Sequence, residues 1–154
     1  MKSISNQEVN SYLQLLGILH LIIWKTYSDG MSSVESDYQL PATSDIFNTF
    51  EPYDESHPVY TFVCDLLRLA CDGGFSVRVL REYADAYGKA TTLTDELSSL
   101  FECAKLTLLA AFSGADQNEA VECGRQGIPA SEKPTYIELQ DFLFELRKSR
   151  ALDV

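Results

Sequence analysis

The chain has 154 residues, of which 45% are hydrophobic and 23% charged, a length and composition typical of one globular domain. We therefore expect a single domain over residues 1–154. Twelve Lys and Arg against 23 Asp and Glu give a formal charge of −11. Nucleic acids and anionic membranes carry charge of the same sign, so direct binding to nucleic acid or to a membrane is not expected.

The first predicted element is a helix over about residues 6–27. Ser5 and Glu8 have the spacing of a capping box at its start, and Gly30 follows its end. Residues 12–24 are almost all apolar, but this run is too short to span a bilayer and lacks the basic start and cleavage site of a signal peptide. We interpret it as a helix buried at the centre of the fold.

Residues 28–57 have a different composition, rich in Ser, Asp, Glu and Pro. Pro41 and Pro52 prevent long regular elements, although the pattern is compatible with a short helical turn that starts at Ser44. The segment is predicted to be a long acidic loop between the first and second helices. Loops of this length in compact domains are usually functional or disordered.

The rest of the chain carries apolar residues at helical spacing, interrupted by glycine and by capping residues. Asp116 and Glu119, and again Thr135 and Glu138, have the spacing of capping boxes. Residues 124–134 are predicted to form a loop that contains Gly and Pro, and no strand-like alternation occurs. The predicted helices cover residues 58–72, 76–87, 94–112, 117–123 and 135–150. We therefore predict an all-α, single-domain bundle of five or six helices.

Four cysteines are present, and none forms a C-x-x-C pair. Three of them lie in apolar helical patterns, and the chain is neither short enough nor rich enough in cysteine for a secreted disulfide scaffold. We expect reduced, mostly buried thiols and hence a location in the cytoplasm. The four are Cys64, Cys71, Cys103 and Cys123.

The sequence contains no recognisable pattern for catalysis or metal binding. Neither of the two histidines, His20 and His57, follows a glutamate at the spacing of a di-iron bundle, and no zinc or calcium spacing occurs. Cys64 lies near His57 and beside Asp65, but its place on an apolar helix face favours a structural thiol over a nucleophile. His20 is interpreted as a core histidine. We predict a protein that is not an enzyme and has no cofactor, metal or catalytic residue.

The most unusual feature is the distribution of charge, because no Lys or Arg occurs between Lys25 and Arg68. Eight acidic residues lie in that window, with aromatic residues interleaved among them. Carboxylates can orient a basic partner while aromatic side chains supply the buried contacts, so the pattern favours docking onto a basic protein. The alternative is a solvated loop that Phe47 and Phe50 fix to the bundle. The predicted partner-binding residues are Asp37, Tyr38, Asp45, Phe47, Phe50, Glu51, Tyr53, Asp54 and Glu55.

In size, acidity and lack of motifs, the chain resembles the immunity proteins and defence inhibitors of bacteria, phages and plasmids. This likeness implies a non-enzymatic inhibitor that uses its acidic surface to occlude a basic toxin, nuclease or nucleic-acid-binding complex. An alternative from another class is a helical enzyme or small-ligand carrier with a pocket between the central helices, around Trp24, His20 and the pair Tyr83 and Tyr87. A third hypothesis is a helical scaffold that self-associates through an exposed apolar face.

Overall fold

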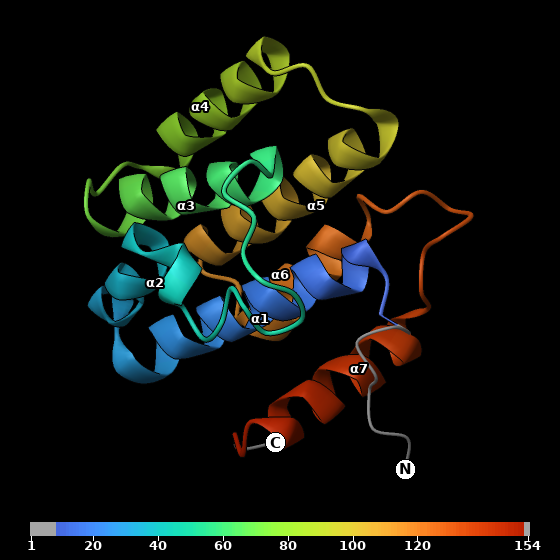
Figure 1. The fold of residues 1–154 in the computed structure, drawn as a ribbon. Coiled ribbons are helices and arrows are strands. Elements are labelled where there is room, and N and C mark those ends of the chain that lie inside the picture. Colours follow the sequence, from blue (N-terminus) through green and yellow to red (C-terminus); the bar gives the residue numbers. More distant parts are fainter. Residues whose placement is uncertain (1–8, 153–154) are drawn as a thin grey trace.

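The structure is a computed structural model and describes residues 9–152 (Figure 1). These residues form seven α-helices and two short 3-10 helices, with no strand among them. The α-helices are α1 Ser11–Asp29, α2 Glu35–Gln39, α3 Pro58–Cys71, α4 Val77–Ala90, α5 Asp95–Phe112, α6 Gln117–Arg125 and α7 Tyr136–Ser149, and the 3-10 helices are η1 Met31–Val34 and η2 Pro41–Thr43. The all-α prediction is confirmed. The predicted count of five or six helices is not confirmed, because α2 lies inside the segment predicted to be a loop.

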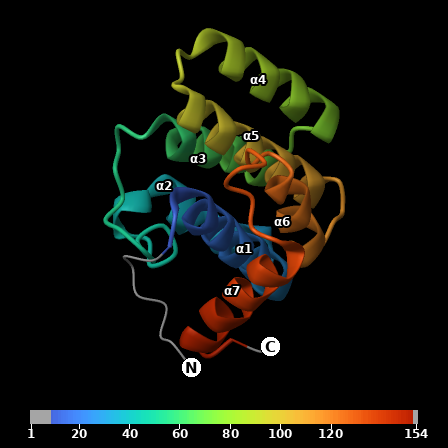
Figure 2. The same cartoon turned by 90° about the vertical axis from the view of Figure 1, so that its right-hand side faces the viewer.

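Helix α1 lies at the centre of the fold, as its apolar sequence predicts. Every residue from Leu15 to Ile23 is buried, and the helix contacts α5, α6, α7 and η1. Figures 1 and 2 show α7 on one side of α1 and α3, α4 and α5 on the other. The helix begins at Ser11, and Asn10 caps it, since the Asn10 side chain accepts a hydrogen bond from the Leu13 amide at 2.9 Å. The capping box predicted at Ser5 and Glu8 lies outside the described residues.

Polar residues at the starts of the later helices set where those helices begin. The capping box of Asp116 and Glu119 forms as predicted, and Thr135 accepts from the Glu138 amide at 3.1 Å. The expected end of α6 is displaced, because the helix continues past Gly124 to Arg125. A Cβ atom at position 124 would lie 2.8 Å from the Leu16 side chain, so the glycine allows α6 to pack closely against α1.

The segment between α1 and α3 is packed against the helices along much of its length. Figure 1 shows it wrapping across α1 and α3, and α2 contacts α3 directly. Apolar side chains along the segment are buried in the main core; they are Val34, Tyr38, Ile46, Phe47 and Phe50. The prediction of a long acidic loop over residues 28–57 is therefore not confirmed, since burial of these side chains folds the segment into short helices and turns.

The part of the chain from residue 9 to residue 152 contains no helix with the length and apolar character needed to cross a bilayer.

Candidate functional site

The nine predicted partner-binding residues differ in their exposure to solvent in the structure. Four of them are buried, with exposed fractions of 8% or less: Asp37, Tyr38, Phe47 and Phe50. Tyr53 is half-buried, and the exposed members are Asp45, Glu51, Asp54 and Glu55. The buried side chains contribute to the core and hold the segment in place. This agrees with the alternative interpretation of the sequence, in which Phe47 and Phe50 fix the segment to the bundle. A contact between the exposed members and a partner stays a prediction.

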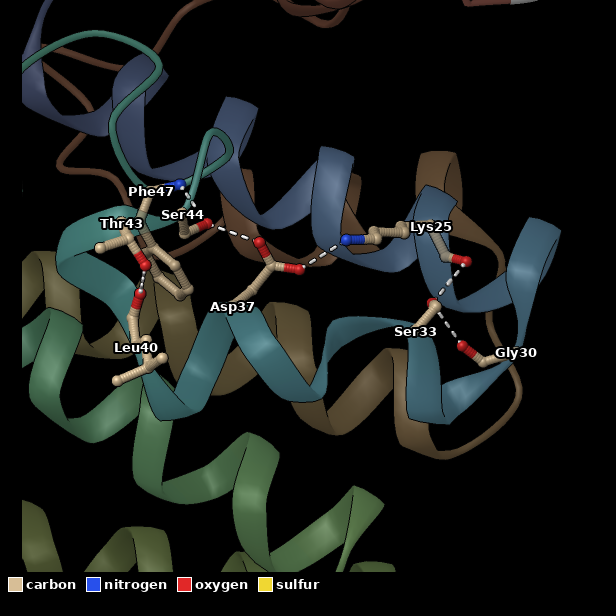
Figure 3. Close-up of polar contacts among 8 residues, drawn as sticks. All are labelled: Lys25, Gly30, Ser33, Asp37, Leu40, Thr43, Ser44 and Phe47. Carbon is tan, nitrogen blue, oxygen red and sulfur yellow. Dashed lines mark hydrogen bonds and ion pairs between the residues drawn. The ribbon is translucent and has the colours of Figure 1, made fainter.

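Asp37 is the centre of a buried polar network that fixes the segment (Figure 3). Its Oδ2 pairs with Lys25 Nζ of α1 at 2.8 Å, and its Oδ1 accepts from Ser44 Oγ at 2.6 Å. Ser44 Oγ in turn accepts from the Phe47 amide at 3.1 Å. Because each acceptor oxygen of the carboxylate has a donor, the buried charge is compensated, and α1 is tied to the turn that carries Phe47.

A small pocket lies where this segment meets α3 and α1. Its volume is about 100 Å³, and its walls include the rings of Phe47, Tyr53, His57 and Tyr60 together with the carboxylate side chains of Glu51 and Asp54. The sequence placed four of these six among the predicted partner-binding residues. It missed His57 and Tyr60, which belong to the first turn of α3 and its cap. The aromatic residues interleaved with the acidic ones between Lys25 and Arg68 include Tyr60, and this pattern is the sequence signal that could have identified it.

The buried His20 belongs to α1 and contacts α7. Its ring is fully buried, and its Nε2 lies 3.0 Å from Arg147 Nη1. Since a guanidinium only donates, Nε2 is the unprotonated acceptor and Nδ1 carries the hydrogen. Desolvation, followed by the charge of Arg147, lowers the His20 pKa from 6.5 to about 4. Arg147 also lies 5.5 Å from the centre of the Trp24 ring, so the group is tightly packed and His20 is neutral at pH 7.

All four cysteines are free thiols in the structure. Burial raises the pKa of Cys64 to about 11 and that of Cys103 to about 12. A thiol with such a pKa is protonated at neutral pH and is a poor nucleophile. Within residues 9–152 no three acidic, histidine or cysteine side chains are grouped as a metal site requires.

The structure also has an apolar groove, at a different place from the pocket expected around His20, Trp24, Tyr83 and Tyr87, since none of these residues lines it. The groove, of about 390 Å³, lies between the C-terminal ends of α1 and α5 and the connection from α3 to α4. Aliphatic side chains such as Ile22, Leu67 and Leu108 line it. Three large apolar side chains along it stay exposed: Tyr27 at 54%, Met31 at 47% and Phe75 at 44%. Its residues are scattered over some 90 positions of sequence, so only Phe75, an aromatic residue directly after Gly73 and Gly74, gave a local signal.

Comparison with known proteins gives one relationship. No protein-family model and no solved structure matches the chain. It is 22% identical to Motility protein A of Salmonella typhimurium over 210 aligned positions, which take in 88% of this chain and 71% of that protein. It is also 22% identical to Motility protein A of Escherichia coli, with 84% of this chain and 69% of that protein aligned. The alignments are longer than the chain, so parts of both relatives have no counterpart in it.

This similarity corrects the functional predictions. The inhibitor of the immunity-protein or anti-defence type is contradicted, because the matched proteins act in motility. The predictions that depended on it are also overturned: a basic protein as partner, no contact with a membrane, and a location in the cytoplasm. The physical reason is that proteins with many different functions are acidic and lack recognisable motifs, so these two properties do not identify a function. What the comparisons establish is that the chain is similar to motility proteins.

Proposed function

We propose that this chain is a component of a cell-motility apparatus and acts there by binding another protein, without catalysis. The observation that carries the proposal is the similarity to Motility protein A, which takes in 88% of the chain and so is not confined to one short segment. An identity of 22% supports a role in the same process, motility. It does not identify the residues that contact the partner protein, so these are inferred from the structure.

The state of the reactive side chains supports a role without catalysis. The imidazole of His20 is packed between Arg147 and Trp24, and burial keeps the thiols of Cys64 and Cys103 protonated. A general base or nucleophile needs access to a substrate and a pKa near the working pH. These groups are instead buried in the core, where a substrate does not reach them.

The apolar groove at the ends of α1 and α5 is the surface we assign to the contact. Its hydroxyl groups are already used, since Thr26 donates to the Ile23 carbonyl at 2.7 Å and Tyr27 donates to the Ala115 carbonyl at 2.6 Å. No charged residue is among its lining residues. An occupant therefore gains little from polar groups and most from burying apolar surface. The matching occupant is a set of apolar side chains on a helix or loop of a partner protein of the apparatus.

A motility assay tests both parts of the proposal. Deletion of the gene in the source organism should abolish or strongly reduce spreading in soft agar without changing growth rate, and the intact gene should restore spreading. Complementation with Met31→Asp should fail, because a charge at this exposed position cannot be buried against an apolar partner. Met31 is the first residue of η1, where an acidic side chain is compatible with the helix.

Ile137→Asp is the matched control. Ile137 is also an exposed apolar residue, at 68%, in the first turn of a helix, but it belongs to α7 and lies outside the groove. This variant should restore spreading as well as the intact gene does. Unchanged motility after deletion would refute the proposed function. Motility restored equally by Met31→Asp and Ile137→Asp would refute the assignment of the groove alone.

A further inference from the structure

We infer that the pocket walled by Phe47, Tyr53 and Tyr60 is a binding site for a small organic cation of the quaternary ammonium class. The inference goes beyond the motility role and does not depend on it. The pocket contacts α1 at Gln14 and Ile18, whereas the apolar groove begins at Ile22 and includes the C-terminal end of the same helix.

The three rings meet at steep angles around one space. Phe47 lies 5.7 Å from Tyr53 and 6.3 Å from Tyr60, and the two tyrosines are 6.4 Å apart, all between ring centroids. The angles between the ring planes are 75°, 86° and 68° for the same pairs. Phe47 is only 3% exposed, so the ring surface open to a ligand belongs mainly to the half-buried Tyr53 and Tyr60, and a cation between these two lies close to more than one ring. This is the arrangement that binds methylated ammonium groups.

The walls are held in place before any ligand arrives. The Phe47 amide donates to Ser44 Oγ at 3.1 Å, and the Tyr53 amide donates to Asn48 Oδ1 at 2.8 Å. Asn48 Nδ2 also donates to the carbonyls of Pro41 and Ser44. The backbone of Tyr60 belongs to the first turn of α3, and its ring contacts that of His57 at 4.8 Å between centroids. Side chains that are already ordered lose little entropy on binding, which favours affinity for a small ligand.

The charge around the pocket has the sign that a cation requires. Glu51 and Asp54 line it, and no Lys or Arg does. His57 is the remaining titratable group with a positive form, and burial lowers its pKa, which favours the neutral ring at pH 7. The carboxylate of Glu51 adds to desolvation in raising the pKa of Tyr60, so its charge acts directly on the pocket.

The chemistry of the walls selects a quaternary over a primary ammonium. A primary ammonium has three N–H donors, each of which needs an acceptor when water is removed. The ring faces offer no such acceptor, and the acceptors that do line the pocket are the Gln14 side chain and the carboxylates of the exposed Glu51 and Asp54. A quaternary ammonium has no N–H group and needs only the ring faces and the nearby negative charge. The volume of about 100 Å³ suits one such group, since pockets for whole drug-sized ligands are roughly 300–1,000 Å³.

The test is an NMR titration of the isotope-labelled full chain with choline chloride, with ionic strength matched by NaCl. We expect saturable shifts of the amide signals of residues 47–60. The neutral carbon analogue 3,3-dimethylbutan-1-ol has the same shape without the charge and should bind at least about tenfold more weakly. Equal affinity for the two compounds, or no saturable shift with choline, would overturn the inference.

Variants locate the site within the chain. Tyr60→Leu removes one ring and should weaken choline binding about tenfold, whereas Tyr136→Leu, an exposed tyrosine of α7 at 53%, should leave it unchanged. Glu51→Gln changes only an exposed carboxylate, so it keeps the test decisive if Tyr60→Leu does not fold. It should weaken binding several-fold. Choline affinity that is unchanged in Glu51→Gln and in folded Tyr60→Leu would refute the site.

Experiments with lipid vesicles distinguish two sources of the cation, a lipid headgroup and a free small molecule. Cosedimentation with phosphatidylcholine vesicles that free choline competes away would assign the site to a lipid headgroup. Binding of choline without binding of these vesicles would assign it to a free ligand. Phosphatidylglycerol vesicles, which lack the quaternary ammonium, serve as the control and should not bind in either case.

Discussion

The imidazole of His20 joins α1 to α7, since it accepts a hydrogen bond from Arg147 while Trp24 lies beside it at 6.0 Å between ring centroids. Its Nδ1 is buried without a hydrogen-bond partner. Protonation would place a second positive charge next to the Arg147 guanidinium in a site that water does not reach. The backbone of Gln117 and the charge of Asp116, at the start of α6, raise the His20 pKa, but by less than desolvation and Arg147 lower it.

We predict that this residue makes stability depend on pH between about 6.5 and 4. The folded pKa is lower than the unfolded value, so the unfolded chain binds the proton first, and stability is lost as pH falls through this window. The drop from 6.5 to about 4 corresponds to about 3 kcal/mol of unfolding free energy. His20→Gln keeps an acceptor for Arg147 but cannot titrate there.

Urea unfolding of the intact chain and of His20→Gln at pH 7 and pH 4.5 measures the effect. Between pH 7 and pH 4.5 the intact chain should lose more unfolding free energy than His20→Gln loses, and the excess should be most of the about 3 kcal/mol. Both proteins also lose stability through other groups, which cancel in the comparison. Equal pH dependence in the two proteins would mean that His20 is not the responsible group.

At the scale of elements, the segment between α1 and α3 depends on long-range contacts. Helix α2 has five residues, too few to be stable alone, and its position is set by burial of Tyr38 and by the pairing of Asp37 with Lys25. The adjoining turn is fixed through Ser44. Removing the Asp37 charge should therefore loosen the segment before it loosens the helical core.

We predict that Asp37→Asn costs about 2 kcal/mol locally, because the amide keeps only one acceptor oxygen and lacks the negative charge, so Lys25 and Ser44 cannot both keep their partner. Hydrogen exchange at the Phe47 amide should become about thirtyfold faster, while amides in the middle of α5 change little. Asp45→Asn is the control, since that side chain is exposed and Arg150 binds its backbone carbonyl. Similar acceleration in both variants would show that the buried network does not hold the segment.

These contacts explain which parts of the fold were predictable. The six longer helices follow from local patterns, such as the capping box of Asp116 and Glu119, which depend on residues three or four apart. Helix α2 depends on Lys25, twelve residues earlier, and no local pattern reports such a pair. The same holds for the candidate sites. Phe47 and Glu51 were predicted from composition, but their meeting with Tyr60 and the assembly of the groove are properties of tertiary structure.

At the scale of the whole molecule, the formal charge of −11 has a consequence for stability that does not depend on function. Twelve basic residues cannot balance 23 acidic ones, so at least eleven carboxylates have no cation of their own. Folding brings these charges closer together than they are in the unfolded chain. Their mutual repulsion lowers the stability of the compact state.

We predict that salt stabilises this protein. The Debye length falls from roughly 10 Å at 0.1 M to about 3 Å at 1 M, which screens repulsion between exposed carboxylates while the half-buried Lys25–Asp37 pair is screened less. The midpoint of thermal unfolding at pH 7 should therefore rise as NaCl is increased over this range. The same series near the pI of about 4.5 is the control, because there the net charge is close to zero and the rise should be much smaller. A midpoint that falls with NaCl at pH 7 would mean that attractive surface ion pairs, such as Lys105–Asp85, outweigh the excess of negative charge.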